Sequence, residues 1–163
     1  MDFFRRSDKR QVPFEYTRIL VPLVGDELVD GPAIKVAKLL IAGREDVEVS
    51  LLHVIEIPFE RHLDTEDSAA TTRAEEILAR SVALLEAAGV PARPLTVQAR
   101  AAGPAIVDDA LEIDADLIVM GLRYKKRFGG QWDAGRTVPY VMRNSTAPVW
   151  CLRAETKELA QTP

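Results

Sequence analysis

A chain of 163 residues, 47% apolar and 28% charged, has the composition of one globular domain with a sizeable core. Its net charge of −4 offers no basic field for nucleic acid, and its single cysteine, Cys151, excludes an intrachain disulfide and a cysteine-based zinc cluster. No apolar run reaches the roughly 20 residues of a membrane-spanning helix, and the charged residues 1–10 lack the apolar centre of a secretory signal, so we expect a cytoplasmic protein.

The first half of the chain alternates strand-like and helix-like patterns. A continuous apolar run at 18–24 is typical of a strand buried on both faces, and turn-forming residues at 25–26 and 30–32 precede a helix at 33–41. A β-branched run at 47–57 predicts the second strand. The longest helix is expected at 69–88, and the residues predicted to share its inner face are Ile77, Ser81, Leu84, Leu85 and Ala88.

The second half continues the alternation. The remaining strands are expected at 93–100, 117–120 and 149–152. The first of these is polar enough for a sheet edge. A short helix is expected to begin at Gly103-Pro104, with Ile106, Ala110 and Leu111 facing the core. A last helix is expected at 137–144, and Thr137 is its candidate hydroxyl cap.

This order of elements predicts an α/β fold with an open five-stranded parallel sheet and helices on both faces. The pattern covers residues 16–153 and contains no internal repeat or linker. Residues 1–15 and 154–163 do not continue the alternation of strand and helix patterns, and we expect them to be loosely held tails.

Open parallel sheets bind ligands beyond the carboxyl ends of their strands, where helix N-termini present free N–H groups. The candidate site therefore lies around Val24, the pair Val54-Ile55 and the segment 121–137. That segment is a glycine-bearing loop that leads into a helix, a geometry that suits phosphate. Its candidate ligand-binding residues are Gly121, Gly129, Gly130, Gly135, Arg136 and Thr137.

The same loop concentrates positive charge in an otherwise acidic protein. Its cations are Arg123, Lys125, Lys126, Arg127 and Arg136. They favour a local site for a small anionic ligand, such as a phosphate or a carboxylate-rich partner; the alternative is a solvated charged loop. The aromatic residues Tyr124, Phe128 and Trp132 alternate with these cations. They would stack on a purine base, anchor a protein contact or hold the loop against the domain.

Four segments in order resemble the signatures of the universal stress protein family. They are residues 18–22, 51–54, 116–121 and 147–149. The resemblance spans about residues 16–153 and implies a Rossmann-like fold, similar to adenine nucleotide alpha hydrolases, with strand order 3-2-1-4-5. It also implies ATP or another adenine nucleotide as the ligand, and a homodimer that pairs the last strands through Val149, Trp150, Cys151 and Leu152.

The chain departs from the pattern of the ATP-binding members of that family. Val24 stands where those members carry an aspartate, although Asp26 follows two residues later. Tyr124 replaces the second loop glycine, and Gly135-Arg136-Thr137 closes the loop after a one-residue insertion. A tyrosine obstructs the close approach of backbone to phosphate that glycine allows, so we expect an altered triphosphate site.

The other chemistry-bearing residues favour structural interpretations. His53 lies on a strand and is expected to be a hydrogen-bonded core histidine, while His62 falls in a polar loop. Cys151 lies inside the last strand, where a buried thiol is a poor nucleophile. The acidic residues Asp108, Asp109, Glu112, Asp114 and Asp116 are expected on a solvated surface. We predict no catalytic residue and no metal site, and no P-loop or dinucleotide-binding motif occurs.

Three functions remain open from the sequence. The first is a non-catalytic regulatory or sensing module that binds a small anionic ligand through the loop 121–137. The second is an adenine-nucleotide-binding protein with weak hydrolysis or none, in which Asp26, Arg123 and Arg136 serve the nucleotide. The third is a cytoplasmic accessory to a membrane transporter, with Phe3-Phe4-Arg5-Arg6 touching an anionic membrane surface.

Overall fold

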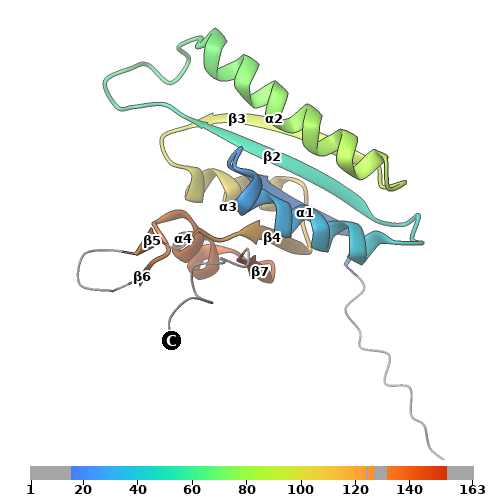
Figure 1. The fold of residues 1–163 in the computed structure, drawn as a ribbon. Helices are drawn as coiled ribbons and strands as arrows, with labels where there is room; N and C mark the ends of the chain where they lie inside the picture. The colour runs from blue at the N-terminus through green and yellow to red at the C-terminus, as the bar shows by residue number, and fades with distance from the viewer. Residues whose placement is uncertain (1–15, 124, 127–131, 154–163) are drawn as a thin grey trace, which may run out of the picture.

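The computed structural model describes residues 16–123, 125–126 and 132–153, and its centre is an all-parallel sheet (Figure 1). The strands in chain order are β1 (Arg18–Leu23), β2 (Glu48–Glu56), β3 (Ala92–Ala99), β4 (Leu117–Gly121) and β7 (Val149–Leu152). They are arranged in the order β3-β2-β1-β4-β7, which confirms the predicted 3-2-1-4-5 topology. The polar strand β3 forms one edge, as its sequence predicts.

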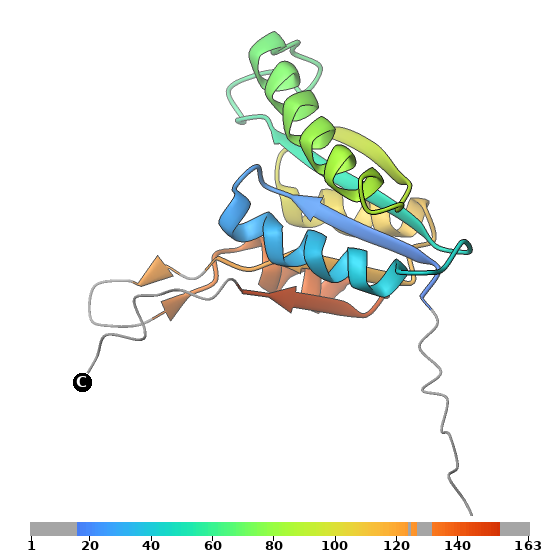
Figure 2. The same cartoon turned by 45° about the vertical axis from the view of Figure 1, so that its right-hand side comes forward.

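Helices cover both faces of the sheet (Figure 2). Helices α1 (Glu27–Ile41) and α2 (Ser68–Glu86) cover one face, and α3 (Ala102–Glu112) and α4 (Thr137–Asn144) cover the other. Alternate residues of β1 enter the two cores: Ile19 and Val21 pack with α1 and α2, whereas Leu20 packs with α3 and α4. This period of two explains why β1 is an unbroken apolar run. Among the described residues, no helix is long and apolar enough to cross a membrane.

Helix α1 begins six residues before the predicted start at residue 33, at Glu27. The cause is Asp26, whose side chain accepts a hydrogen bond from the Leu28 N–H at 3.0 Å and so caps the helix. The predicted turn at 30–32 is therefore wrong, and Gly31 and Pro32 lie inside the helix. A residue before proline avoids the helical conformation because its Cβ meets the proline ring, and glycine at position 31 removes that conflict.

Three further details of the helix predictions are wrong. Leu84 is 53% exposed and Ala88 lies exposed beyond α2, because the buried stripe of this helix runs through Ile77, Ser81 and Leu85. Leu111 on α3 is 54% exposed, one position past the buried Ala110. Thr137 is the first residue of α4 rather than its cap; Arg136 holds the cap position and makes no side-chain cap bond.

Helix α1 lies unusually close to the end of β4. A Cβ atom built on Gly121 would stand 1.9 Å from the carbonyl oxygen of Val29. No side chain fits in that space, so glycine at position 121 is required for α1 to rest on the sheet.

We expect Gly121→Ala to lower the free energy of unfolding by at least about 2 kcal/mol, because the added methyl group must push α1 away from β4. Gly43→Ala is the matched control: Gly43 has a positive φ of 77° but open space around it, so it should cost only about 1 kcal/mol of backbone strain. Urea denaturation of both variants measures the difference. Equal losses would contradict the close contact.

Candidate functional site

A crevice of about 330 Å³ opens where the carboxyl ends of β1, β2 and β4 meet the starts of α3 and α4. Its lining residues are Pro22, Leu23, Val24, Val29, Leu52, His53, Val54, Glu56, Ala102, Ile106, Met120, Gly121 and Thr137. The predicted site residues Val24, Val54, Gly121 and Thr137 thus come together at this edge, whereas Ile55 packs in a small core away from it. The crevice lies at the carboxyl ends of the neighbouring strands β1 and β4, after which the chain runs to α1 on one face of the sheet and to α4 on the other. Folds of this kind bind ligands at that position.

The interior of the crevice is mostly apolar, with two polar side chains on the β2 wall. His53 is half-buried, and its Nδ1 donates a hydrogen bond to the carbonyl oxygen of Leu23 at 2.9 Å. This confirms the expected hydrogen bond but places His53 on the crevice wall instead of inside the core. Glu56 accepts a hydrogen bond from the Ala102 N–H at 2.7 Å, so the chain's own carboxylate occupies the N-terminus of α3.

An ion pair joins the two loops beside the crevice. The Arg123 guanidinium, just after β4, contacts the Asp26 carboxylate at the start of α1. The Arg123 side chain is 51% exposed and that of Asp26 is 29% exposed, so water and a dissolved anion can reach the pair. Two predicted ligand-binding residues therefore do meet at the predicted place, where they bind each other.

The loop after β4 contains a short antiparallel ribbon that the sequence did not predict. It consists of β5 (Lys125–Lys126) and β6 (Trp132–Asp133), and it extends from the main sheet at the strands' carboxyl edge (Figure 2). The backbone of Lys125 lies opposite that of Asp133 in the register of this ribbon. The predicted site residues Gly129 and Gly130, together with Tyr124 and Arg127, lie outside the described residues.

The ribbon leads into α4 through a tight turn. Gly135 adopts a positive φ of 73°, which favours glycine, and its N–H donates to the Asp133 carboxylate at 3.0 Å. Arg136 follows as an exposed residue at the cap of α4. An acidic side chain thus stands at the turn that precedes the N-terminus of α4.

Asp30 is the buried charge that shapes the rim of the crevice. It is 6% exposed, and its two carboxylate oxygens accept hydrogen bonds from the N–H groups of Val24 at 2.9 Å and Gly25 at 2.8 Å. Burial raises the pKa of the Asp30 carboxyl, an effect that these two bonds and the charge of His53 oppose. The sequence predicted that Asp30 lies in a turn. The signal that could have placed it in the helix was its position one helical turn after Asp26, a residue type that caps helices.

The remaining candidates lie away from the crevice. Burial raises the pKa of the Cys151 thiol, which weakens it as a nucleophile. Asp109 is half-buried, and burial together with Glu112 and Asp108 raises the pKa of its carboxyl, so this member of the acidic cluster is less solvated than expected. Asp116 instead joins the starts of β1 and β4 by accepting bonds from Thr17 and Arg18. Over the part of the chain that the structure describes, no group of three acidic, histidine or cysteine side chains could hold a metal ion.

The parallel sheet and its crevice define a Rossmann-like α/β protein of the kind that binds ligands beyond the carboxyl ends of its strands. The sequence itself assigns the family. The model of the universal stress protein family matches residues 15–153, and the chain belongs to that family.

Solved structures with the same fold include several universal stress proteins. One from Archaeoglobus fulgidus is 22% identical, with a TM-score of 0.70 over 85% of this chain and 99% of the other. The Archaeoglobus fulgidus protein in complex with dAMP is 22% identical, with a TM-score of 0.68 over 85% and 98%. A universal stress protein family protein from Arabidopsis thaliana with AMP bound is 15% identical, with a TM-score of 0.64 over 87% and 94%. No curated protein sequence matches the chain significantly.

We expect Asp30→Ala to lower the free energy of unfolding by about 1–3 kcal/mol, because the N–H groups of Val24 and Gly25 lose their acceptors at the crevice rim. Glu75→Ala, which removes an exposed carboxylate from α2, should stay within about 0.5 kcal/mol of the unmodified protein. Thermal or urea unfolding of the two variants provides the measurement. A loss no larger for Asp30→Ala than for Glu75→Ala would mean that these bonds add nothing to stability.

Proposed function

We propose that this protein is a non-catalytic regulatory or sensing module that binds a small anionic ligand, with an adenine mononucleotide as the first compound to test. The ion pair between Asp26 and Arg123 beside the apolar crevice is the observation that carries this proposal. It supplies a cation that an incoming phosphate can take from Asp26, next to a mostly apolar crevice of about 330 Å³.

The chemistry of the crevice favours recognition of a monophosphate over a triphosphate. Val24 has no side-chain hydrogen-bonding group for a ribose, and the carboxylates of Glu56 and Asp133 already accept N–H bonds at the starts of α3 and α4. A chain of phosphates would meet these negative charges. A single phosphate near Arg123 and Arg136 would meet fewer of them.

Relatives in the family support the choice of test ligand. The proteins of known structure include one in complex with dAMP and one with AMP bound. Binding without turnover also fits the crevice wall, because the Nδ1 of His53 is engaged in a hydrogen bond to the carbonyl oxygen of Leu23. ATP binding with slow hydrolysis is the alternative, and a phosphate-release assay with ATP separates the two.

We expect AMP to bind saturably and Arg123→Ala to weaken binding on the order of tenfold, which corresponds to loss of one charge-assisted contact. Asp26→Asn should tighten binding, because asparagine still caps α1 but no longer neutralises Arg123. Isothermal titration calorimetry measures both effects.

Arg143→Ala on α4 is the control for these titrations, since this exposed cation does not line the crevice. Equal affinities for Arg123→Ala and Arg143→Ala would remove Arg123 from the site. A screen of nucleotides, cyclic dinucleotides and simple anions without any thermal shift would overturn the proposal and favour a module that acts by protein contact alone.

We further propose that β7 pairs with its copy in a homodimer, as the family resemblance implies. β7 is the outer strand of the sheet on that side, and Trp150 on it is 37% exposed and packs edge-on against Tyr16 with ring centroids 5.6 Å apart. An exposed edge strand with a large aromatic residue is a ready surface for pairing.

The expected result is a dimer in sedimentation velocity that Cys151→Pro dissociates. The bonds from Ile118 N–H to Pro148 and from Leu122 N–H to Leu152 fix the register of β7, and in a parallel ladder this leaves the N–H of Cys151 facing outward. Cys151→Ser keeps that N–H and should stay dimeric. A monomer for the unmodified protein would contradict the proposal.

The transporter-accessory hypothesis depends on residues 1–15, which lie outside the described residues, and it stays a prediction.

A further inference from the structure

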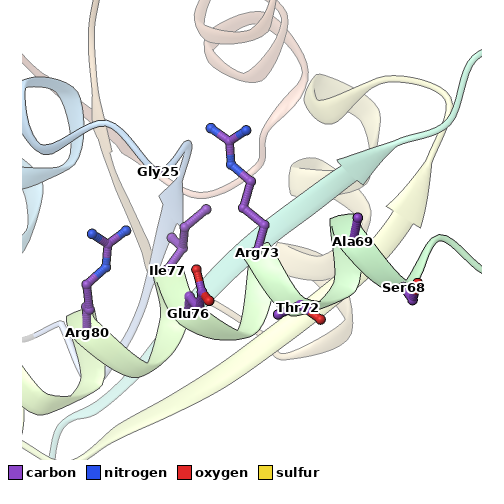
Figure 3. A pocket seen from close by; sticks show the side chains of 8 residues that line it. All are labelled: Gly25, Ser68, Ala69, Thr72, Arg73, Glu76, Ile77 and Arg80. Atoms are coloured by element: carbon purple, nitrogen blue, oxygen red, sulfur yellow. The ribbon is translucent and has the colours of Figure 1, made fainter.

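A long groove separates α1 and α2 on the face of the sheet opposite α3 and α4. One part, of about 800 Å³, lies between the two helices along most of α1. A second part, of about 560 Å³, continues along the first half of α2 (Figure 3). The two parts adjoin, because they share Gly25, Ile77 and Arg80, and we call them together the α1–α2 groove. The crevice described above draws no residue from α2.

Each wall of the α1–α2 groove exposes a leucine, and only the one on α2 was expected to face a core. Leu39 on α1 is 71% exposed and Leu84 on α2 is 53% exposed, and both line the groove. Between them the floor is apolar, formed by the buried Ile34 and Ile77. Large apolar side chains on both walls of a depression are typical of a protein contact surface.

The rim of the groove is positively charged. Lys35 and Lys38 stand on α1, and Arg73 and Arg80 extend from α2 toward the turn at Gly25 (Figure 3). Within the described part of the chain, none of these four cations forms an ion pair. The only exposed carboxylates in the lining are Glu27 and Glu76, because the Asp30 carboxylate is buried and bonded to Val24 and Gly25. A local excess of positive charge in a protein of net charge −4 indicates an acidic partner.

The middle of the α1–α2 groove is open because Gly31 carries no side chain. A Cβ atom built there would have no neighbour within 4 Å, apart from the adjacent residues of the chain. Glycine at this position relieves the conflict with Pro32, and it also leaves room for another backbone to approach α1 closely. From Glu27 to Leu39 the α1 wall is about 18 Å long at the rise of an α-helix, which corresponds to roughly three turns of a docked helix.

We propose that the α1–α2 groove binds an acidic amphipathic helix of a partner protein. The apolar face of that helix would rest on Ile34, Leu39 and Leu84, and its carboxylates would meet Lys35, Lys38, Arg73 and Arg80. This is the helix-in-groove mode of recognition, in which apolar anchors at helical spacing supply affinity and flanking charges select the partner. The proposal does not depend on a ligand in the crevice.

The experiment uses the full chain and a synthetic probe. The probe is a fluorescein-labelled helical peptide of 16 residues or so, with leucine at positions i, i+3, i+4 and i+7 and glutamate on the other faces, about four turns long. A second peptide carries lysine in place of every glutamate. Fluorescence anisotropy should show saturable binding of the acidic peptide, weaker at higher salt, and no binding of the basic one.

Variants locate the binding. The double variant Lys35→Glu/Arg80→Glu should weaken binding of the acidic peptide on the order of tenfold. Its control, Arg93→Glu/Arg143→Glu, changes the net charge by the same amount on other elements and should leave the affinity for the peptide unchanged. Leu84→Gln should weaken binding, and Leu111→Gln on α3 is its control because the two leucines are equally exposed, at 53% and 54%. All six substituted positions are exposed, so these variants are expected to fold.

Three outcomes would overturn the proposal. The first is no binding of the acidic peptide, or equal weakening by the groove variants and their controls. The second is a different oligomeric state of the double variant Lys35→Glu/Arg80→Glu from that of the unmodified protein, which would assign the groove to a second copy of this chain. The third is saturable binding of laurate in this groove without peptide binding, which would assign it to a small anionic amphiphile. AMP affinity should not change in any groove variant, which keeps this test separate from that of the crevice.

Discussion

The contact between α1 and the end of β4 is the constraint on which the rest of the structure depends. The carbonyl oxygen of Val29 lies where any Cβ at position 121 would stand, so the helix can rest there only over a glycine. The buried carboxylate of Asp30 then holds the turn from β1 into α1 through the N–H groups of Val24 and Gly25. Together these two contacts bring the start of α1 beside the exit of β4, and only then can Asp26 reach Arg123.

The crevice that results differs in chemistry from an open phosphate cradle. The chain supplies its own acidic partners at the places where a polyphosphate would need donors: Glu56 at the start of α3, Asp133 before α4, and Asp26 on Arg123. Charges that are already neutralised inside the protein make a weak field for a large anion, but an exchangeable ion pair still lets a small anion compete for Arg123. This balance is the reason that we propose a single phosphate rather than three as the ligand of this site.

The same turn at residues 24–25 also borders the α1–α2 groove. Val24 lines the crevice, whereas Gly25 and Asp30 line the groove, so the two surfaces are separated by little more than the Asp30 carboxylate and its two hydrogen bonds. The two surfaces thus carry different chemistry: a mostly apolar crevice at the carboxyl edge of the sheet, and a cationic groove with exposed leucines between α1 and α2.

The sequence by itself determined the family, the parallel α/β fold and the edge at which the crevice lies, because buried strands and the glycine at the exit of β4 leave patterns that are local in the chain. It also located Val24, Gly121, Arg123 and Thr137 at that edge. The tertiary structure alone decided what those residues contact. Asp30 looked like a turn residue until its bonds to Val24 and Gly25 were visible, and Leu84 looked like a core residue because helical spacing cannot show that α1 and α2 stay apart. Periodicity reports which side of a helix is apolar, but the distance to the neighbouring element depends on residues far away in the sequence, and that distance separates a core from a groove.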